Sequence, residues 1–490
     1  MATGTLISLS LYFVLMLGIG LYAWRKSTAD SEGYLLGGRQ LSPAVAALSA
    51  GASDMSGWLL MGLPGALYVS GLVEAWIGIG LFVGALVNWI VVAPRLREQT
   101  VSYGNALTIP EFLANRFPGQ AVTLRLASAV IIVTFFAVYT AAGLVGGGKL
   151  FDTAFPALLS GMDIGLSDYM LGVWLTAGVV LAYTMVGGFL AVSLTDFVQG
   201  CIMVVALVIM PLVVMFGVGG QGGQSLAQVQ PGFLSLTQGL TFVGFLSAVT
   251  WGLGYFGQPH IIVRFMAVKS VEAVPTARNI GMTWMGVALL GAIGVGTAGR
   301  AYVERSGLVV DDPETIFIVL ADLLFHPLVT GFLLAALLAA IMSTISSQLL
   351  VASSSLTEDF YRLFFRKQAS EREMVNVGRL CVLLVALAAI AIASDPDSQV
   401  LGLVSNAWAG FGAAFGPLIV LSLTWDRMTG KGAVAGLVTG ALVVLAWISA
   451  GLNTSFMGGP GVYEIIPGFI AAWIAIVLVS RLGEPRTPAV

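Results

Sequence analysis

The stretch Ser49-Ala50-Gly51-Ala52-Ser53-Asp54-Met55-Ser56-Gly57 lies in the middle of an apolar segment that runs over 43–67. The segment is long enough to cross a bilayer, which takes about 20 residues. Serine and glycine weaken a helix, and a carboxylate at membrane depth is costly unless it faces a polar cavity. The stretch therefore predicts a membrane-spanning helix that is unwound near its middle and lines a cavity.

A second apolar segment, near 240–266, is interrupted in the same way by glycines and a proline. Its centre reads Thr250-Trp251-Gly252-Leu253-Gly254-Tyr255-Phe256-Gly257-Gln258-Pro259-His260. A broken helix leaves unpaired N–H groups at one end and unpaired carbonyls at the other, which can hold a carboxylate and a small hard cation. The two breaks are five helices apart, a spacing that indicates two inverted repeats, each beginning with a discontinuous helix.

The composition excludes a soluble protein. Of 490 residues, 58% are hydrophobic and 10% are charged, and the mean hydropathy is +0.94, whereas a soluble domain carries about 25% charged residues. The two cysteines lie in apolar runs, and neither histidine has partners at the spacing of a metal site or a catalytic triad. We therefore expect a lipid bilayer as the surroundings, no enzymatic activity, and neither a nucleic acid nor a protein as partner.

The apolar segments predict an all-α integral membrane protein with thirteen transmembrane helices in a single domain over 1–490. An extra helix at 5–24 precedes repeat one at about 43–217, repeat two covers about 240–425, and two further helices lie within about 432–481. The thirteen segments are 5–24, 43–67, 72–94, 124–148, 168–187, 190–217, 240–266, 280–299, 326–357, 374–393, 398–425, 432–450 and 464–481.

Lysine and arginine are distributed unevenly between the two sides of the predicted bundle. All but three of the 22 follow odd-numbered helices, and the exceptions are Lys149, Arg300 and Arg305. Because cytoplasmic loops carry the excess of these residues, the N-terminus is expected outside, the C-terminus in the cytoplasm, and the number of spans is expected to be odd. In the loop after the third helix, residues 108–113 predict a short helix at the membrane interface.

The ninth segment carries a row of hydroxyl groups. Ser343 and Thr344 follow Ala340 by three and four residues and precede Ser347 by four and three, so the four residues share one face of a helix. Hydroxyls in a membrane helix can bond carbonyls one turn back in their own helix, or they can face a neighbouring helix or a cavity. The residues alone leave these two alternatives open.

Long blocks of the sequence resemble the proline-transporting members of the sodium:solute symporter family. The resemblance covers nearly the whole chain, and blocks of this length are far more specific than a short motif. The blocks are residues 49–66 around the first break, Leu36-Gly37-Gly38-Arg39, Gly187-Gly188-Phe189-Leu190-Ala191-Val192-Ser193, Gly252-Leu253-Gly254-Tyr255-Phe256-Gly257-Gln258-Pro259-His260 and Ser405-Asn406-Ala407-Trp408-Ala409-Gly410-Phe411-Gly412.

This resemblance implies a LeuT-type core of two inverted five-helix repeats. It also implies sodium-driven symport of L-proline through the cell membrane by alternating access, with Na⁺ as the coupling ion. Two alternatives stay open. The solute could be another small amino acid or carboxylate, or the chain could be an uncoupled channel or a sensor on the same fold.

The resemblance further implies two sets of binding residues. The Na⁺ ligands are the carbonyls of Ala52, Met55 and Ala340 and the hydroxyls of Ser343 and Thr344. The proline pocket comprises Ser56, Gly57, Tyr139, Trp251, Tyr255 and Pro259. Five oxygen ligands suit Na⁺, and a small apolar box with a few donors fits a pyrrolidine ring that carries a carboxylate.

Other polar residues have implied or alternative roles. Arg39, at the cytoplasmic entrance of the first broken helix, resembles a coupling or gating residue, and Asp54 is expected to organise the break rather than bind the ion. Asp196 is a carboxylate at membrane depth and needs a cation, a proton or a polar cavity. Together with Ser346 and Ser347 it matches, in residue type, a second Na⁺ site of some family members. The alternative is that Asp196 lines the cytoplasmic exit.

Overall fold

The computed structural model describes residues 3–26, 31–156, 165–217 and 230–483, and most of them are helical. The α-helices are α1 (Thr3–Lys26), α2 (Ser31–Leu36), α3 (Pro43–Asp54), α4 (Leu63–Ser70), α5 (Ala75–Ser102), α6 (Ile109–Arg116), α7 (Ala121–Ala154), α9 (Asp168–Leu212), α11 (Phe242–Val249), α12 (Pro259–Ala267), α13 (Val274–Ser306), α14 (Ile316–Leu324), α15 (Pro327–Ser354), α16 (Arg362–Phe364), α17 (Glu371–Ile392), α18 (Val400–Thr424), α19 (Gly430–Ser449) and α20 (Ile465–Leu482). Shorter 3₁₀ or π turns are η1 (Gly37–Arg39), η2 (Trp58–Gly62), η3 (Leu72–Glu74), η4 (Pro118–Gln120), η5 (Val213–Gly217), η6 (Thr250–Gly257), η7 (Val271–Ala273), η8 (Pro313–Thr315) and η9 (Ser355–Tyr361). A small antiparallel hairpin pairs β1 (Ser455–Phe456) with β2 (Gly459–Pro460).

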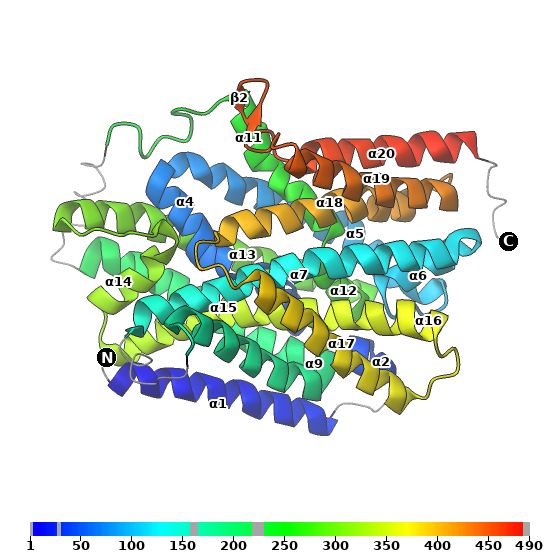
Figure 1. The fold of residues 1–490 in the computed structure, drawn as a ribbon, viewed down its shortest axis with the longest axis horizontal. Helices are drawn as coiled ribbons and strands as arrows, with labels where there is room; N and C mark the ends of the chain where they lie inside the picture. The colour runs from blue at the N-terminus through cyan, green and yellow to red at the C-terminus, as the bar shows by residue number, and fades with distance from the viewer. Residues whose placement is uncertain (1–2, 27–30, 157–164, 218–229, 484–490) are drawn as a thin grey trace.

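Eleven helical segments within the described ranges are long and apolar enough to cross a membrane. They run roughly along one direction, with α1 along one edge of the bundle and α19 and α20 along the opposite edge (Figure 1). Two shorter apolar helices, Trp58–Ser70 and Phe242–Gly257, occupy the segments in which breaks are predicted. The prediction of an all-α membrane protein is confirmed.

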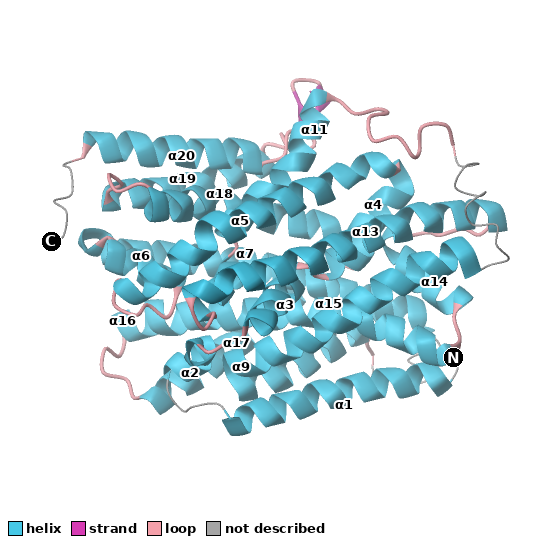
Figure 2. Cartoon of the chain, turned by 180° about the vertical axis from the view of Figure 1, so that it is seen from behind, coloured by secondary structure: helices cyan, strands magenta, loops and turns pink. Residues whose placement is uncertain are grey.

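The two ends of the bundle keep the predicted division of the loops. Figures 1 and 2 show α2, α6 and α16 at one end and α4 and α14 at the other. The helices α2, α6 and α16 follow the first, third and ninth predicted spans, so their loops share one side. The short helix predicted at 108–113 is present as α6, and the side chain of Thr108 caps it by accepting the N–H of Glu111 at 3.1 Å.

The centre of the bundle is formed by α15 and α18. In their most apolar stretches 83% and 89% of the residues are buried, against 28% in both α1 and α20. The outer helices expose leucine, isoleucine and valine, as expected of surfaces in contact with lipid. The helix that carries the hydroxyl row is therefore a core element, and each of those hydroxyls must find its partner inside the protein.

The first predicted break lies at the end of α3. Met55 leaves the helical conformation (φ −79°, ψ 76°), and the chain resumes as η2 and α4. The N–H of Met55 still donates to the carbonyl of Gly51 at 2.9 Å, whereas the N–H of Ser56 turns back to the carbonyl of Asp54 at 2.9 Å. The prediction of an unwound segment is confirmed, and the unwinding is confined to about one turn.

The second predicted break separates η6 from α12. Gln258 is extended (φ −82°, ψ 104°), and Pro259 opens α12, a position that suits proline because the first N–H groups of a helix have no partner within it. The side-chain amide of Gln258 donates to the carbonyls of Gly254 at 3.1 Å and Trp408 at 3.0 Å. The side chain at the break thus gives a donor to a carbonyl of η6 and joins the break to α18.

The long helix α9 contains a sharp bend at Gly188. Its φ of 59° lies in the left-handed region, which favours glycine, and a Cβ atom there would lie 2.6 Å from the ring of Tyr34. The bend separates the apolar stretches Asp168–Met185 and Gly187–Phe216. These correspond to the fifth and sixth predicted helices, so a kink replaces the expected loop.

Opposite charges gather where α18 begins. Glu314, in η8, accepts the N–H groups of Val400 at 2.9 Å and Leu401 at 3.0 Å, and it lies 2.9 Å from the ammonium of Lys149. Asp312 lies 2.8 Å from the same ammonium. A carboxylate at a helix N-terminus is stabilised by the helix dipole. The cluster joins α7, η8 and α18.

Candidate functional site

Four oxygen atoms meet where α3 crosses α15. The hydroxyl of Ser343 lies 2.6 Å from the carbonyl oxygen of Ala52 and 3.1 Å from that of Ala340. The hydroxyl of Thr344 lies 3.5 and 3.2 Å from the same two carbonyls. All four residues are buried. Hard cations bind oxygen ligands, so this cluster can hold a small cation inside the bundle.

The structure thus brings together four of the five predicted Na⁺ ligands. The fifth, Met55, is the buried cap of α3, and its backbone N–H donates to the carbonyl of Gly51. The two alternatives for the hydroxyl row coexist, because Ser343 and Thr344 bond a carbonyl one turn back in α15 and also reach across to α3. A bound cation would compete for the lone pairs that these bonds use.

Asp54 sits at the end of α3 and connects the two broken helices. Its carboxylate accepts the hydroxyl of Tyr255, from η6. Its backbone carbonyl accepts the indole N–H of Trp58 at 3.0 Å and lies 3.5 Å from the hydroxyl of Tyr139. The side chain is buried, and the hydroxyl of Tyr255 gives its carboxylate a polar partner inside the protein. The contacts join the end of α3 to η6, and the role expected for Asp54, organising the break, stays a prediction.

Aromatic rings form the wall beside the second break. The ring of Tyr255 meets that of Trp408 edge-on at 5.0 Å, and the ring of Trp251 stacks on Tyr463 at 5.1 Å. The indole N–H of Trp408 donates to the carbonyl of Trp251 at 2.7 Å. The amide of Asn88 donates to the carbonyl of Tyr255 at 3.1 Å. Side chains of α5 and α18 thus donate to carbonyls of η6, and its rings pack against α18 and the segment before α20.

The other predicted pocket residues have different surroundings. Ser56 accepts the N–H of Trp58 at 3.4 Å, and a side chain at Gly57 would approach Ile341 of α15 to 3.3 Å. Pro259 instead lines a separate cavity of about 10 Å³ with residues of the α2 and α6 regions. A cavity of about 20 Å³ lies beside Asp54. It is large enough for a water molecule but not for a pyrrolidine ring.

Arg39 ties together the ends of α3 and α12 that lie away from the breaks. Its guanidinium donates to the carbonyl of Met266 at 2.8 Å and to the side chain of Asn105 at 3.0 Å. Beside it, Leu41 and Val268 form an isolated parallel bridge. Burial lowers the pKa of Arg39 to about 10, so the group remains charged at neutral pH. The two half-helices are therefore joined at this end of the bundle.

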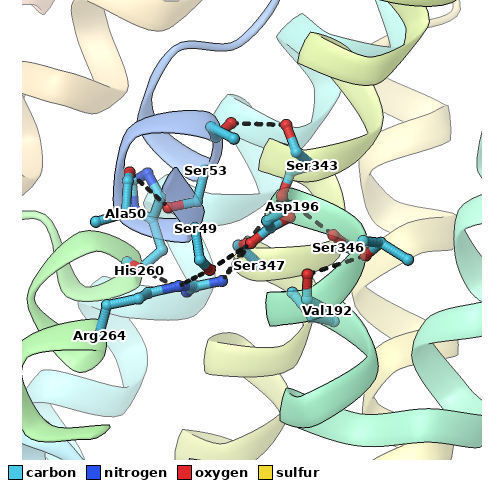
Figure 3. A network of polar contacts seen from close by, with 12 residues as sticks. Ser49, Ala50, Ser53, Val192, Asp196, His260, Arg264, Ser343, Ser346 and Ser347 are labelled. Carbon is cyan, nitrogen blue, oxygen red and sulfur yellow. Dashed lines mark hydrogen bonds and ion pairs between the residues drawn. The ribbon is translucent and has the colours of Figure 1, made fainter. Parts of the chain in front are cut away.

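Asp196 belongs to a buried polar network rather than to an open site (Figure 3). Its Oδ2 atom accepts the hydroxyl of Ser49 at 2.8 Å and lies 3.0 Å from the guanidinium of Arg264. The hydroxyl of Ser347 lies 3.4 Å from the same oxygen. Ser346 instead donates to the carbonyl of Ser343 at 3.1 Å, within its own helix. The structure brings Asp196 and Ser347 together and leaves Ser346 beside them.

Two residues of this region were missed by the sequence reasoning. We counted Arg264 among the loop charges, but it is fully buried, and that assignment is wrong. The signal was available, because Arg264 lies inside the predicted segment 240–266 and not after it. Trp408 stands in a block that carried the family resemblance but was given no role. Its contacts with Trp251 and Tyr255 connect residues far apart in the sequence, which no local pattern predicts.

Comparison with known proteins identifies close relatives over nearly the whole chain. The model of the sodium:solute symporter family matches residues 34–440. The chain is 51% identical to the osmoregulated proline transporter OpuE of Bacillus subtilis, over 99% of this chain and 96% of that protein. It is 52% identical to a sodium/proline symporter of Staphylococcus aureus, over 98% of this chain and 93% of that protein.

Solved structures share the fold at much lower sequence identity. A Na⁺-coupled sialic acid symporter in a substrate-bound, outward-open state aligns over 100% of both chains, with a TM-score of 0.81 and 19% identity. A transporter of the nucleobase-cation-symport-1 family in a closed conformation aligns over 93% of this chain and 96% of its own, with a TM-score of 0.55 and 14% identity. At these identities the likeness concerns the fold, which is of the LeuT type.

Proposed function

The chain belongs to the sodium:solute symporter family, and we propose that it carries L-proline into the cell together with Na⁺. The observation that carries this proposal is the full-length identity of 51–52% to two proteins that are both named as proline transporters. The oxygen cluster between α3 and α15 supports the coupling to a small cation. The aromatic wall around the breaks supports a small, partly apolar solute. A transporter of this kind is not an enzyme.

We propose that Na⁺ binds between α3 and α15, to the carbonyls of Ala52, Met55 and Ala340 and the hydroxyls of Ser343 and Thr344. The closeness of four of these groups supports the assignment. Proline would then bind beside the breaks, among Ser56, Gly57, Tyr139, Trp251, Tyr255 and Pro259. Tyr255 bonds Asp54, which lies between the proposed ligands Ala52 and Met55, so the proposed solute and ion sites would be neighbours.

Each broken helix is proposed to complete one membrane crossing, α3 with α4 and α11 with α12. Added to the eleven continuous candidates, these give the expected thirteen crossings, with the N-terminus outside and the C-terminus in the cytoplasm. Residues 43–217 and 240–425 would form the two inverted repeats within a single domain over 1–490. We further propose that Arg39 makes α3 and α12 move as one body when the site opens to the cytoplasm, since it joins their ends.

Experiments can distinguish the proposed function from two alternatives. Another small amino acid or carboxylate could be the preferred solute, and a panel of unlabelled competitors against radiolabelled proline uptake separates these cases. Proline should compete best, and stronger competition by a different solute would replace it in our proposal. An uncoupled channel would pass Na⁺ without proline and could not accumulate proline against its gradient.

Truncating the aromatic wall should weaken proline binding selectively. Tyr255→Ala and Trp251→Ala each remove an apolar wall, which costs about 1–3 kcal/mol and corresponds to a loss of affinity of about fivefold to 150-fold. Proline affinity can be measured by equilibrium binding to the purified protein, with Na⁺ binding measured in parallel and expected to persist. Trp174→Ala, which truncates an exposed ring on α9, is the matched control. An affinity within about twofold of the unmodified protein would remove these rings from the pocket.

A further inference from the structure

Arg264 is a charged residue buried completely inside the bundle, near the end of α12. Its Nη2 atom lies 3.0 Å from Oδ2 of Asp196 and 2.6 Å from the hydroxyl of Ser347, and its Nε atom lies 3.0 Å from the hydroxyl of Ser49 (Figure 3). Its Nη1 atom donates to the carbonyl of His260 at 2.6 Å. The guanidinium thus has four oxygen partners, drawn from α3, α9, α12 and α15.

Three of these partners are the groups that a second small cation would use. A carboxylate and two hydroxyls, one from each neighbouring helix, form a set of hard oxygen ligands. In this structure the positive charge among them belongs to Arg264. Adding Na⁺ would place two positive charges against one buried carboxylate. The excess charge would lie inside the membrane protein, where it is strongly disfavoured.

The network lies one helical turn from the proposed Na⁺ site, on the same two helices. Ser49 precedes Ala52 by three residues on α3, and Ser347 follows Ser343 by four on α15, so each pair shares a helix face. The hydroxyl of Ser347 also donates to the carbonyl of Ser343 at 2.8 Å. The two polar clusters are therefore neighbours: one is the proposed Na⁺ site, and the other holds the guanidinium of Arg264.

We propose that Arg264 acts as a fixed cation at Asp196 and thereby limits the transporter to one Na⁺ per proline. A neutral residue at position 264 would leave Asp196, Ser49 and Ser347 free to bind a second Na⁺. Arg264 is thus a residue that determines the ion stoichiometry without touching the solute. This inference rests on the proposed Na⁺-coupled proline transport. Of the two alternatives for Asp196, it argues against a second Na⁺ site in the unmodified protein.

The first test uses the unmodified protein in proteoliposomes. The membrane potential at which the coupled flux of proline reverses is measured at fixed gradients of Na⁺ and proline, and it gives the ratio of ions to solute. A ratio of one is expected. A ratio of two would overturn the role of Arg264 while leaving Na⁺-coupled symport in place. An absence of Na⁺-dependent proline flux would instead contradict the proposed function, and the inference would fall with it.

The second test counts bound ions directly. Radioactive ²²Na⁺ binding to the purified protein, without proline and at saturating Na⁺ and mildly alkaline pH, should give one ion in the unmodified protein and two in Arg264→Gln. Arg264→Lys, which keeps the charge, should bind one. The double variant Arg264→Gln/Asp196→Asn should also return to one.

A single ion bound by folded Arg264→Gln would overturn the proposal, as would a second ion that persists in the double variant. If Arg264→Gln does not fold, the ratio from the reversal potential and the ion count of Arg264→Lys still decide. Two ions bound by Arg264→Lys would contradict a fixed cation at this position.

Discussion

Replacing Gly252 with alanine should remove most of the folded transporter from the membrane. In η6 this glycine packs against the backbone of α5, and a Cβ atom would lie 2.2 Å from the carbonyl oxygen of Gly80. A backbone atom cannot move aside as the end of a side chain can, so α5 and η6 would have to separate. Overpacking of this kind costs about 1–3 kcal/mol or more. It would also pull η6, with Tyr255 and Trp251, away from the first break.

The measurement is the yield of monodisperse protein after extraction in detergent, together with its melting temperature. Gly178→Ala is the matched control, because a Cβ atom at this glycine of α9 meets no other atom within 4 Å. Alanine should be tolerated there and even favoured, since it stabilises a helix by about 1 kcal/mol relative to glycine. Normal yield and melting temperature for Gly252→Ala would mean that η6 and α5 do not pack as closely as described.

Removing either hydroxyl of the oxygen cluster should raise the Na⁺ concentration needed for half-maximal proline uptake by about tenfold or more. A hydrogen bond or ligand contact to a charged group contributes about 1.5–3 kcal/mol, and 1.4 kcal/mol corresponds to a factor of ten. Ser343→Ala and Thr344→Ala each delete one oxygen that faces the carbonyl of Ala52. The fold should be affected less, because the bonds lost are to carbonyls that keep other partners in α15.

Initial uptake rates across a range of Na⁺ concentrations, at equal protein abundance, measure this effect. Ser354→Ala serves as the control, since the hydroxyl of Ser354 bonds a carbonyl of its own helix, that of Val351, at 2.8 Å. Its Na⁺ dependence should be unchanged. If Ser343→Ala and Thr344→Ala behave like Ser354→Ala, the ion does not bind on this face of α15.

Local composition was enough to predict the two breaks. Gly51, Ser53 and Asp54 weaken the first helix within a few residues, and Gly257 with Pro259 does the same in the second. Such signals need no knowledge of neighbouring helices. The distribution of lysine and arginine likewise predicted which loops share an end of the bundle, because this distribution depends on the side of the membrane and not on contacts between helices.

Long-range contacts were beyond local reasoning. Nothing near Arg264 in the sequence indicates Asp196, 68 residues away, or Ser347, 83 residues away. Trp408 reaches Trp251 across 157 residues in the same way. Three-dimensional packing also changed the meaning of a pattern. Gly252, taken from the sequence as a helix breaker, serves in the structure to bring η6 against α5.

The most direct test of Na⁺-coupled proline transport is accumulation of radiolabelled proline in proteoliposomes that contain the purified protein. An inward tenfold Na⁺ gradient contributes about 1.4 kcal/mol per ion and a membrane potential of about 100 mV adds about 2.3 kcal/mol. With one ion per proline, these support accumulation of up to about 500-fold, and dissipating the Na⁺ gradient or the potential should each lower it. Proline that only equilibrates across the membrane, or that accumulates equally well when K⁺ replaces Na⁺, would contradict the account.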